Sequence, residues 1–254
     1  MGANLNEFVL QLVDTRTKRP IDDDTGKVIV MNPGLPTKPT LYSDIQGSSQ
    51  ANPVTISNGV IRFFTDPSVT SVDLSVMTAL GVALFLEDVT PSMGRVDVDH
   101  EQRHNVLVAP FLSNAAGTVT DTGVDFPANC LISDAFVKVT TLDTGETLSV
   151  GFENAVESGD LDGLIAAVSM SATGYIENAP VATAGSNIDF LAATTYGALL
   201  ASAITGTDVV TVNGAYARKK YRTDGTIKSL VYTPSSTTSD DSAGYIFVGY
   251  DRLI

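Results

Sequence analysis

The sequence predicts an all-β protein made of two β-sandwich or jelly-roll-like domains, with at most one short helix. Apolar and β-branched residues occur in short runs, and several runs alternate with the period of two that strands require. These runs recur at roughly ten-residue spacing, which is typical of sandwich strands. The intervals between them are rich in the turn-forming residues Gly, Asn, Asp, Ser and Thr. A chain of 254 residues has room for two domains of ordinary size.

The first predicted strand lies near the N-terminus, where large apolar residues occupy every second position: Phe8, Leu10 and Leu12. Segments 53–56 and 60–64 are predicted to form a hairpin. The Asn58-Gly59 pair between them can adopt the positive φ angles of a type I′ turn at little steric cost. The other strands that we expect in this half are 27–31, 69–76 and 79–86.

The pattern changes after residue 86, which suggests a domain boundary. Segment 87–105 contains a proline, a glycine, five acidic residues and both histidines of the chain. We therefore predict an N-terminal β-sandwich domain at 1–95, a linker at 96–105 and a C-terminal β domain at 106–254. Val96 and Val98 leave open a short strand within the linker.

The C-terminal half continues the strand pattern. The segments expected to form strands are 106–112, 130–141, 146–152, 226–233 and 244–250. One segment departs from the pattern, because Leu161, Leu164, Ile165 and Val168 follow the helical spacing i, i+3, i+4, i+7. This spacing predicts a short helix at 161–169.

Composition and charge exclude several classes of protein. The chain carries 29 acidic and 15 basic residues, a formal net charge of −14, so it lacks the basic surface of a nucleic-acid partner. A single cysteine, Cys130, excludes a disulfide within the chain and a cysteine-based zinc cluster. The apolar stretch 79–86 is far shorter than the roughly 20 residues that a membrane helix needs. No basic leader with an apolar segment begins the sequence, so we expect no signal peptide and no membrane association.

One motif matches a zinc-binding pattern literally. His100, Glu101 and His104 form H-E-x-x-H, in which a helix places both imidazoles on one face and the glutamate acts as general base. Here the preceding residues 96–99 alternate with a period of two, and no further histidine exists to complete the ligand set. We interpret the motif as part of a solvated linker, and we predict no metal site, no cofactor and no catalytic residues.

Two acidic clusters allow two interpretations. Residues 22–24 precede Gly26, and Glu157, Asp160 and Asp162 precede Gly163. Either set could offer oxygen ligands to Ca²⁺, although neither follows the twelve-residue EF-hand register. The first is equally compatible with a charged turn, and the second with the first turn of the short helix.

Basic residues gather in one run. Segment 218–222 holds four of the fifteen basic residues, and these form the predicted partner-contact set: Arg218, Lys219, Lys220 and Arg222. They could face solvent on a strand, or they could contact an acidic partner surface such as a neighbouring subunit. Cys130 opens a predicted strand beside Leu131 and Ile132, so we expect a buried, unreactive thiol.

Two sets of segments carry a resemblance to bacteriophage proteins. Segments 39–44 and 51–54, with the Asn58-Gly59 turn, resemble small β modules of tailed-bacteriophage structural proteins. The second set covers about residues 106–254, and its order is similar to that of phage head decoration (cement) proteins. Its segments are 121–128, 134–140, 147–152, 157–163, 226–233 and 242–248.

The resemblance implies a non-enzymatic virion protein on the capsid exterior, assembled in the host cytoplasm. Such a protein binds the major capsid protein, as a rule as a homotrimer, and clamps neighbouring capsid subunits. The alternative function is a phage fibre-base or adhesin module that binds a host glycan or protein. That alternative predicts exposed aromatic side chains, because sugars stack on aromatic rings.

Overall fold

The chain folds into two compact all-β units, residues 1–110 and 111–253, in the computed structural model. The structure describes residues 5–91, 93–99, 101–113, 117–143, 145–153, 161–176, 221–223, 228–235 and 242–253. No helix forms within these residues, so the all-β prediction is confirmed. The strand β10 (His104–Leu112) crosses from the first unit into the second.

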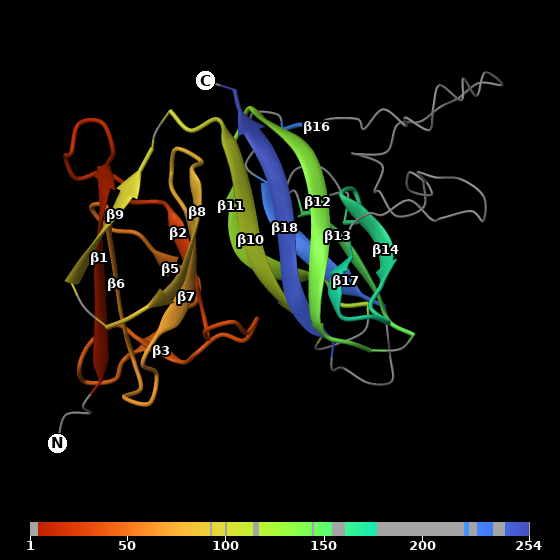
Figure 1. The fold of residues 1–254 in the computed structure, drawn as a ribbon, viewed down its shortest axis with the longest axis horizontal. Helices are drawn as coiled ribbons and strands as arrows, with labels where there is room; N and C mark the ends of the chain where they lie inside the picture. The colour runs from red at the N-terminus through yellow and green to blue at the C-terminus, as the bar shows by residue number, and fades with distance from the viewer. Residues whose placement is uncertain are drawn as a thin grey trace. The chain divides into compact units, whose positions relative to one another are not determined.

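Unit 1 is a sandwich of two sheets, visible as two layers in Figure 1. The first sheet has the order β4-β3-β6-β1-β9, and the second has the order β5-β2-β7-β8. Neighbouring strands are antiparallel except β1 and β9, which are parallel. The strands are β1 (Asn6–Asp14), β2 (Lys27–Met31), β3 (Leu41–Tyr42), β4 (Ser49–Gln50), β5 (Val54–Thr55), β6 (Val60–Thr65), β7 (Val72–Met77), β8 (Ala83–Val89) and β9 (Met93–Val98).

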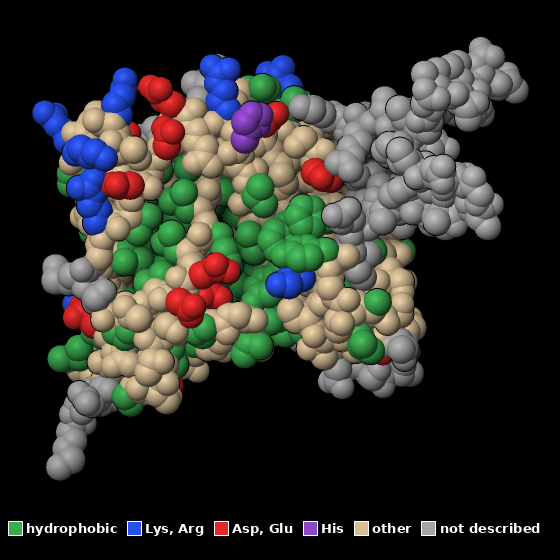
Figure 2. Space-filling view, viewed as in Figure 1, with side chains coloured by type: hydrophobic (Ala, Val, Ile, Leu, Met, Phe, Trp, Pro, Cys, Tyr) green, Lys and Arg blue, Asp and Glu red, His purple; other side chains and the backbone are tan. Residues whose placement is uncertain are grey.

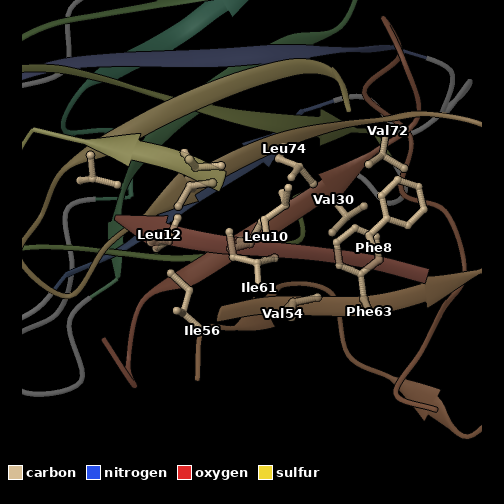
Figure 3. Close-up of a cluster of buried hydrophobic side chains, with 14 of the residues drawn as sticks. Phe8, Leu10, Leu12, Val30, Val54, Ile56, Ile61, Phe63, Val72 and Leu74 are labelled. Atoms are coloured by element: carbon tan, nitrogen blue, oxygen red, sulfur yellow. The ribbon is translucent and has the colours of Figure 1, made fainter. Parts of the chain in front are cut away.

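The core of unit 1 lies between these sheets, where side chains from β1 and β6 meet those from β2 and β7 (Figure 3). Phe8 and Phe63 stack with ring centroids 4.9 Å apart, and both are fully buried. The alternation that predicted β1 holds, since Phe8, Leu10 and Leu12 all point into this core. The burial of one such side chain stabilises the folded state by about 1.5–3 kcal/mol.

The predicted hairpin is correct at its turn and wrong in its pairing. Asn58 and Gly59 have φ angles of 49° and 67°, and Ser57 and Val60 exchange backbone hydrogen bonds across them. Beyond this bridge the two arms separate into different sheets, because β5 pairs with β2 whereas β6 pairs with β1 and β3. The turn is thus a connection between the two layers.

Unit 2 is also a two-sheet sandwich. One sheet has the order β10-β18-β12-β15, with β16 also pairing with β12, and the other has the order β11-β17-β13-β14. Phe126 packs against Phe152 of its own sheet and against Tyr250 of the facing sheet, at centroid distances of 5.3 and 5.2 Å. The strands that follow β10 are β11 (Thr120–Phe126), β12 (Cys130–Thr141), β13 (Thr147–Glu153), β14 (Ile165–Ser169), β15 (Gly174–Ile176), β16 (Tyr221–Arg222), β17 (Lys228–Pro234) and β18 (Ala243–Arg252).

The helix predicted at 161–169 is wrong, because Ile165–Ser169 is strand β14. Its pairing with β13 slips by one residue between Val168 and Ile165, and Ala167 has a positive φ of 52°. This bulge turns both Ile165 and Val168 toward the core, although they are three residues apart. A bulged strand therefore reproduced the spacing of a helix.

The predicted linker 96–105 contains ordered structure. Val96 and Val98 lie in β9 and are buried in the core of unit 1. Asn105 is also buried, and its side-chain oxygen accepts a hydrogen bond from the Ala83 amide at 3.0 Å. Residues from this segment thus belong to the packing of unit 1.

Candidate interaction surface

The sheet β10-β18-β12-β15 turns one face toward the core of unit 2 and the other face outward. Along β12, Ala135, Val137 and Val139 are buried, whereas Phe136 and Lys138 between them are partly exposed. A strand places successive side chains on opposite faces, so Phe136 and Lys138 share the outward face. This arrangement places an aromatic ring and an ammonium group on the outward face of β12.

Aromatic rings from three strands gather on this outward face. Phe136 of β12 is directly opposite Phe247 of β18, and their rings stack at 4.8 Å with an interplanar angle of 6°. Tyr175 of β15 lies 6.2 Å from Phe136 and 6.0 Å from Phe247, measured between ring centroids. The Tyr175 side chain is 61% exposed, the highest value among the exposed large hydrophobic residues of the described chain.

A second row of residues crosses the same three strands. Lys138 is paired with Tyr245 on one side and with Tyr175 on the other. Its ammonium nitrogen lies 5.3 Å from the centroid of the Tyr175 ring, a favourable cation–π geometry. The positive charge is therefore held beside the aromatic rings.

Asp134 carries a negative charge on β12, two residues before Phe136 and on the opposite side of that ring from Lys138. The β12–β18 pairing has a bulge between Ile132 and Asp134. Gly249 is opposite Asp134 and lies two residues after Phe247, so it is on the outward face of β18. A Cβ atom built on Gly249 would lie 3.7 Å from the Asp134 Cβ, which places the Asp134 side chain on this face as well. We call the set Asp134, Phe136, Lys138, Tyr175 and Phe247 the aromatic face. Figure 2 shows hydrophobic side chains gathered over β12 and β18, with a basic side chain beside them.

The basic run is only partly described. Arg222 lies in β16, where it pairs with Leu131, and its side chain is exposed. One guanidinium nitrogen donates to the Asn129 side-chain oxygen at 3.3 Å. Arg218, Lys219 and Lys220 lie outside the described residues, so their role as partner contacts stays a prediction.

The H-E-x-x-H segment does not form a helix between residues 101 and 104. Residue 101 lies in a turn, and β10 begins at His104, whose side chain is exposed. Glu101 forms an exposed ion pair with Arg16 at 3.5 Å. His100 lies outside the described residues. The spacing of the motif therefore lacks the helical turn that would carry zinc ligands on one face.

The acidic turn before β2 uses its carboxylates to bind backbone amides. Asp23 is 2% exposed, and its Oδ1 accepts hydrogen bonds from the amides of Thr25 and Gly26 at 3.1 and 2.8 Å. Asp24 accepts a hydrogen bond from the Asn58 amide. These contacts fit a structural turn. In the second acidic cluster, Asp162 lies in a turn before β14, and Glu157 and Asp160 lie outside the described residues.

A buried carboxyl group lies inside unit 2. Glu146 is 1% exposed, and one of its oxygens accepts a hydrogen bond from the Ser113 hydroxyl group. The other Glu146 oxygen and the Ser242 hydroxyl group are buried without a hydrogen-bond partner among the described residues. Ser113 also donates its backbone amide to the Ser242 carbonyl at 2.9 Å. Ser113 therefore joins the strand ends of both sheets at this point.

The aromatic face was not among the predicted sites, because Phe136 and Phe247 lie in segments that were predicted only as strands, with no face assigned to either ring. Across the described part of the chain, no three metal-ligating side chains converge, and no helix has the length and apolar character to cross a bilayer. Comparisons with protein families, curated proteins and solved structures found no match for this chain.

Proposed function

We propose that this chain is a structural virion protein of a tailed bacteriophage. It binds the outer surface of the assembled capsid and stabilises contacts between major capsid subunits. Its function depends on shape and on many copies, and it requires neither a reactive centre nor a cofactor.

One observation supports this proposal above the others. The segments that resemble decoration proteins fall mainly within unit 2, and five of them supply strands of its two sheets: β11, β12, β13, β17 and β18. The second set of resembling segments therefore falls within one folding unit, and this supports the proposal.

The physical properties of the chain suit this role. A clamp on a shell needs an extended protein interface, which many modest contacts can build without one strong site. A net charge of −14 favours solubility of the free chain before it meets the shell.

The test is co-sedimentation of the full chain with emptied, expanded capsids of the phage that encodes it. We expect saturable binding to these capsids and no binding to the unassembled capsid protein. Binding to neither would contradict the proposal. The double variant His100→Ala, His104→Ala should bind as the wild type does, and a large loss would place a contact in segment 96–105.

The alternative function, an adhesin module, is favoured by one specific observation, the exposed Tyr175 ring within the aromatic face. Pyranose rings stack on such surfaces. A glycan array with the full chain, and with Tyr175→Ala as the matched variant, tests this alternative. Glycan binding that Tyr175→Ala abolishes, together with no capsid binding, would favour the adhesin.

A further inference from the structure

We propose that the aromatic face is self-complementary and joins two copies of this chain about a two-fold axis. This contact is independent of capsid binding, and it replaces the three-fold arrangement that the resemblance implies.

The argument starts from the order of side chains along β12. Asp134, Phe136 and Lys138 follow one another on the outward face, with a negative group, an aromatic ring and a positive group in sequence. Alternate residues of a strand are spaced about 6.6–6.8 Å apart. The two charges therefore stand on either side of Phe136 at similar distances.

The charge pattern selects one way for two such faces to meet. Suppose that the outward sheets of two copies pack face to face. A two-fold axis that lies in the plane between them, perpendicular to β12 and level with Phe136, makes the two β12 strands antiparallel. Lys138 of each copy then faces Asp134 of the other, and the ion pair occurs twice because the contact is isologous. An axis parallel to β12 would instead place like charges opposite each other, which is unfavourable.

The aromatic rings fit the same axis. Phe136 and Phe247 lie opposite each other across the two strands, so their row runs roughly along the proposed axis. Each phenylalanine then meets the same residue of the second copy, and Tyr175 lies at the side of the contact. The centre is apolar and the charges lie at its edge, as in known protein interfaces.

The mixed charge of this face is complementary to that of a second copy of the chain. The chain carries a net charge of −14, so two copies repel each other at most orientations. In the two-fold orientation, Lys138 of each copy attracts Asp134 of the other, and this attraction opposes the general repulsion between the copies. The pairing should consequently weaken on mutation of either charge.

The experiment measures the molar mass of the full chain by light scattering over a dilution series. The variants are Asp134→Lys, Lys138→Asp and the double swap that carries both changes. Each single reversal places like charges opposite each other twice and should weaken the dimer by about 10- to 100-fold. The double swap restores opposite charges and should restore the dimer.

Two further variants separate this contact from general effects. Glu153→Lys reverses an exposed charge at the end of β13, outside the aromatic face, and should leave the dimer unchanged. Phe247→Ala shortens the aromatic row and should weaken the dimer without changing any charge. Circular dichroism of each variant establishes that it is folded before its mass is compared.

Several results would overturn the proposal. These are a wild-type chain that stays monomeric or forms trimers, a dimer that neither reversal weakens, and a double swap that stays dissociated while folded. A monomer that binds glycans through Tyr175 would assign the face to sugar recognition instead. Capsid binding is measured separately, so a monomer that still binds capsids would reject only the two-fold contact.

Discussion

The Asp23 carboxylate accepts a hydrogen bond from the backbone amide of Ala79 at 2.8 Å. It thereby joins the loop before β2 to the turn between β7 and β8. The same carboxylate binds the amides of Thr25 and Gly26, so one buried side chain satisfies three backbone donors. Buried backbone donors without partners are costly, and Asp23 therefore fixes two connections of unit 1 at once.

Asp23→Asn should destabilise the chain by about 2–3 kcal/mol. Both carboxylate oxygens of Asp23 accept hydrogen bonds from backbone amides. In asparagine an NH₂ group replaces one of these oxygens, so at least one backbone amide would lose its acceptor and face another donor. Urea unfolding followed by circular dichroism measures this change. Asp22→Asn is the matched control, because Asp22 is exposed, and it should shift the midpoint little. Equal effects of the two variants would contradict this role of Asp23.

The Asn58-Gly59 turn leads to a second prediction. Gly59 has a φ of 67°, and a Cβ atom there would overlap the carbonyl oxygen of Ile21. Gly34 has nearly the same φ, 65°, with no atom within 4 Å of its Cβ position. Gly34→Ala should therefore cost only the backbone strain of about 1 kcal/mol. Gly59→Ala should cost about 2–3 kcal/mol more, because the backbone must also move.

Thermal unfolding of both glycine variants measures this difference directly. Because both positions have nearly the same positive φ, the difference reports mainly on the steric contact with Ile21. Similar midpoints for the two variants would show that the turn moves freely.

The Ser113 hydroxyl group is predicted to stabilise unit 2 through Glu146. Ser113→Ala leaves the buried carboxyl group without its hydrogen-bond donor and should cost about 1–3 kcal/mol. Ser171→Ala, at an exposed position of the same unit, is the control and should be nearly neutral. Urea midpoints of the two variants provide the comparison, and an unchanged midpoint in Ser113→Ala would mean that another group binds Glu146.

Much of the fold could be predicted because period-two patterns report which face of a strand is buried. The ranges 27–31 and 130–141 match β2 and β12 at both ends. The sequence could not show that the arms of the Asn58-Gly59 turn enter different sheets, because pairing depends on distant strands. The bulge at Ala167 likewise depends on β13, so the pattern around it indicated a helix.

The candidate surface was harder to predict for a related reason. Hydrophobic side chains in a strand normally indicate the core. The period-two pattern nevertheless holds a signal, because Phe136 falls on the same alternate positions as Asp134 and Lys138. The pairing of β12 with β18 and β15 brings these rings together with Tyr175. Residues more than one hundred positions apart thus form the face, and only the folded sheet reveals it.

Two buried tyrosines predict how stability depends on pH. Burial raises the pKa of Tyr250 far above its ordinary value of 10.0, the negative charge of ionised Cys130 raises it further, and Arg252 opposes both. Burial also raises the pKa of Tyr232, and the Leu112 amide, which donates a hydrogen bond to the phenol oxygen at 3.2 Å, partly offsets this. The folded chain therefore keeps both phenols protonated at a pH at which the unfolded chain loses these protons.

The sign of the effect follows from this difference. The stability gained from the neutral, buried phenols is present below the ordinary pKa and is lost as the pH rises above it. Each tyrosine should lower the free energy of unfolding by up to about 1.4 kcal/mol per pH unit in this range. Urea unfolding between about pH 9 and about pH 11 measures the slope. Tyr250→Phe should make the slope shallower, whereas Tyr175→Phe, at an exposed ring, should leave it unchanged. A wild-type slope near zero would mean that both phenols already ionise in the folded chain.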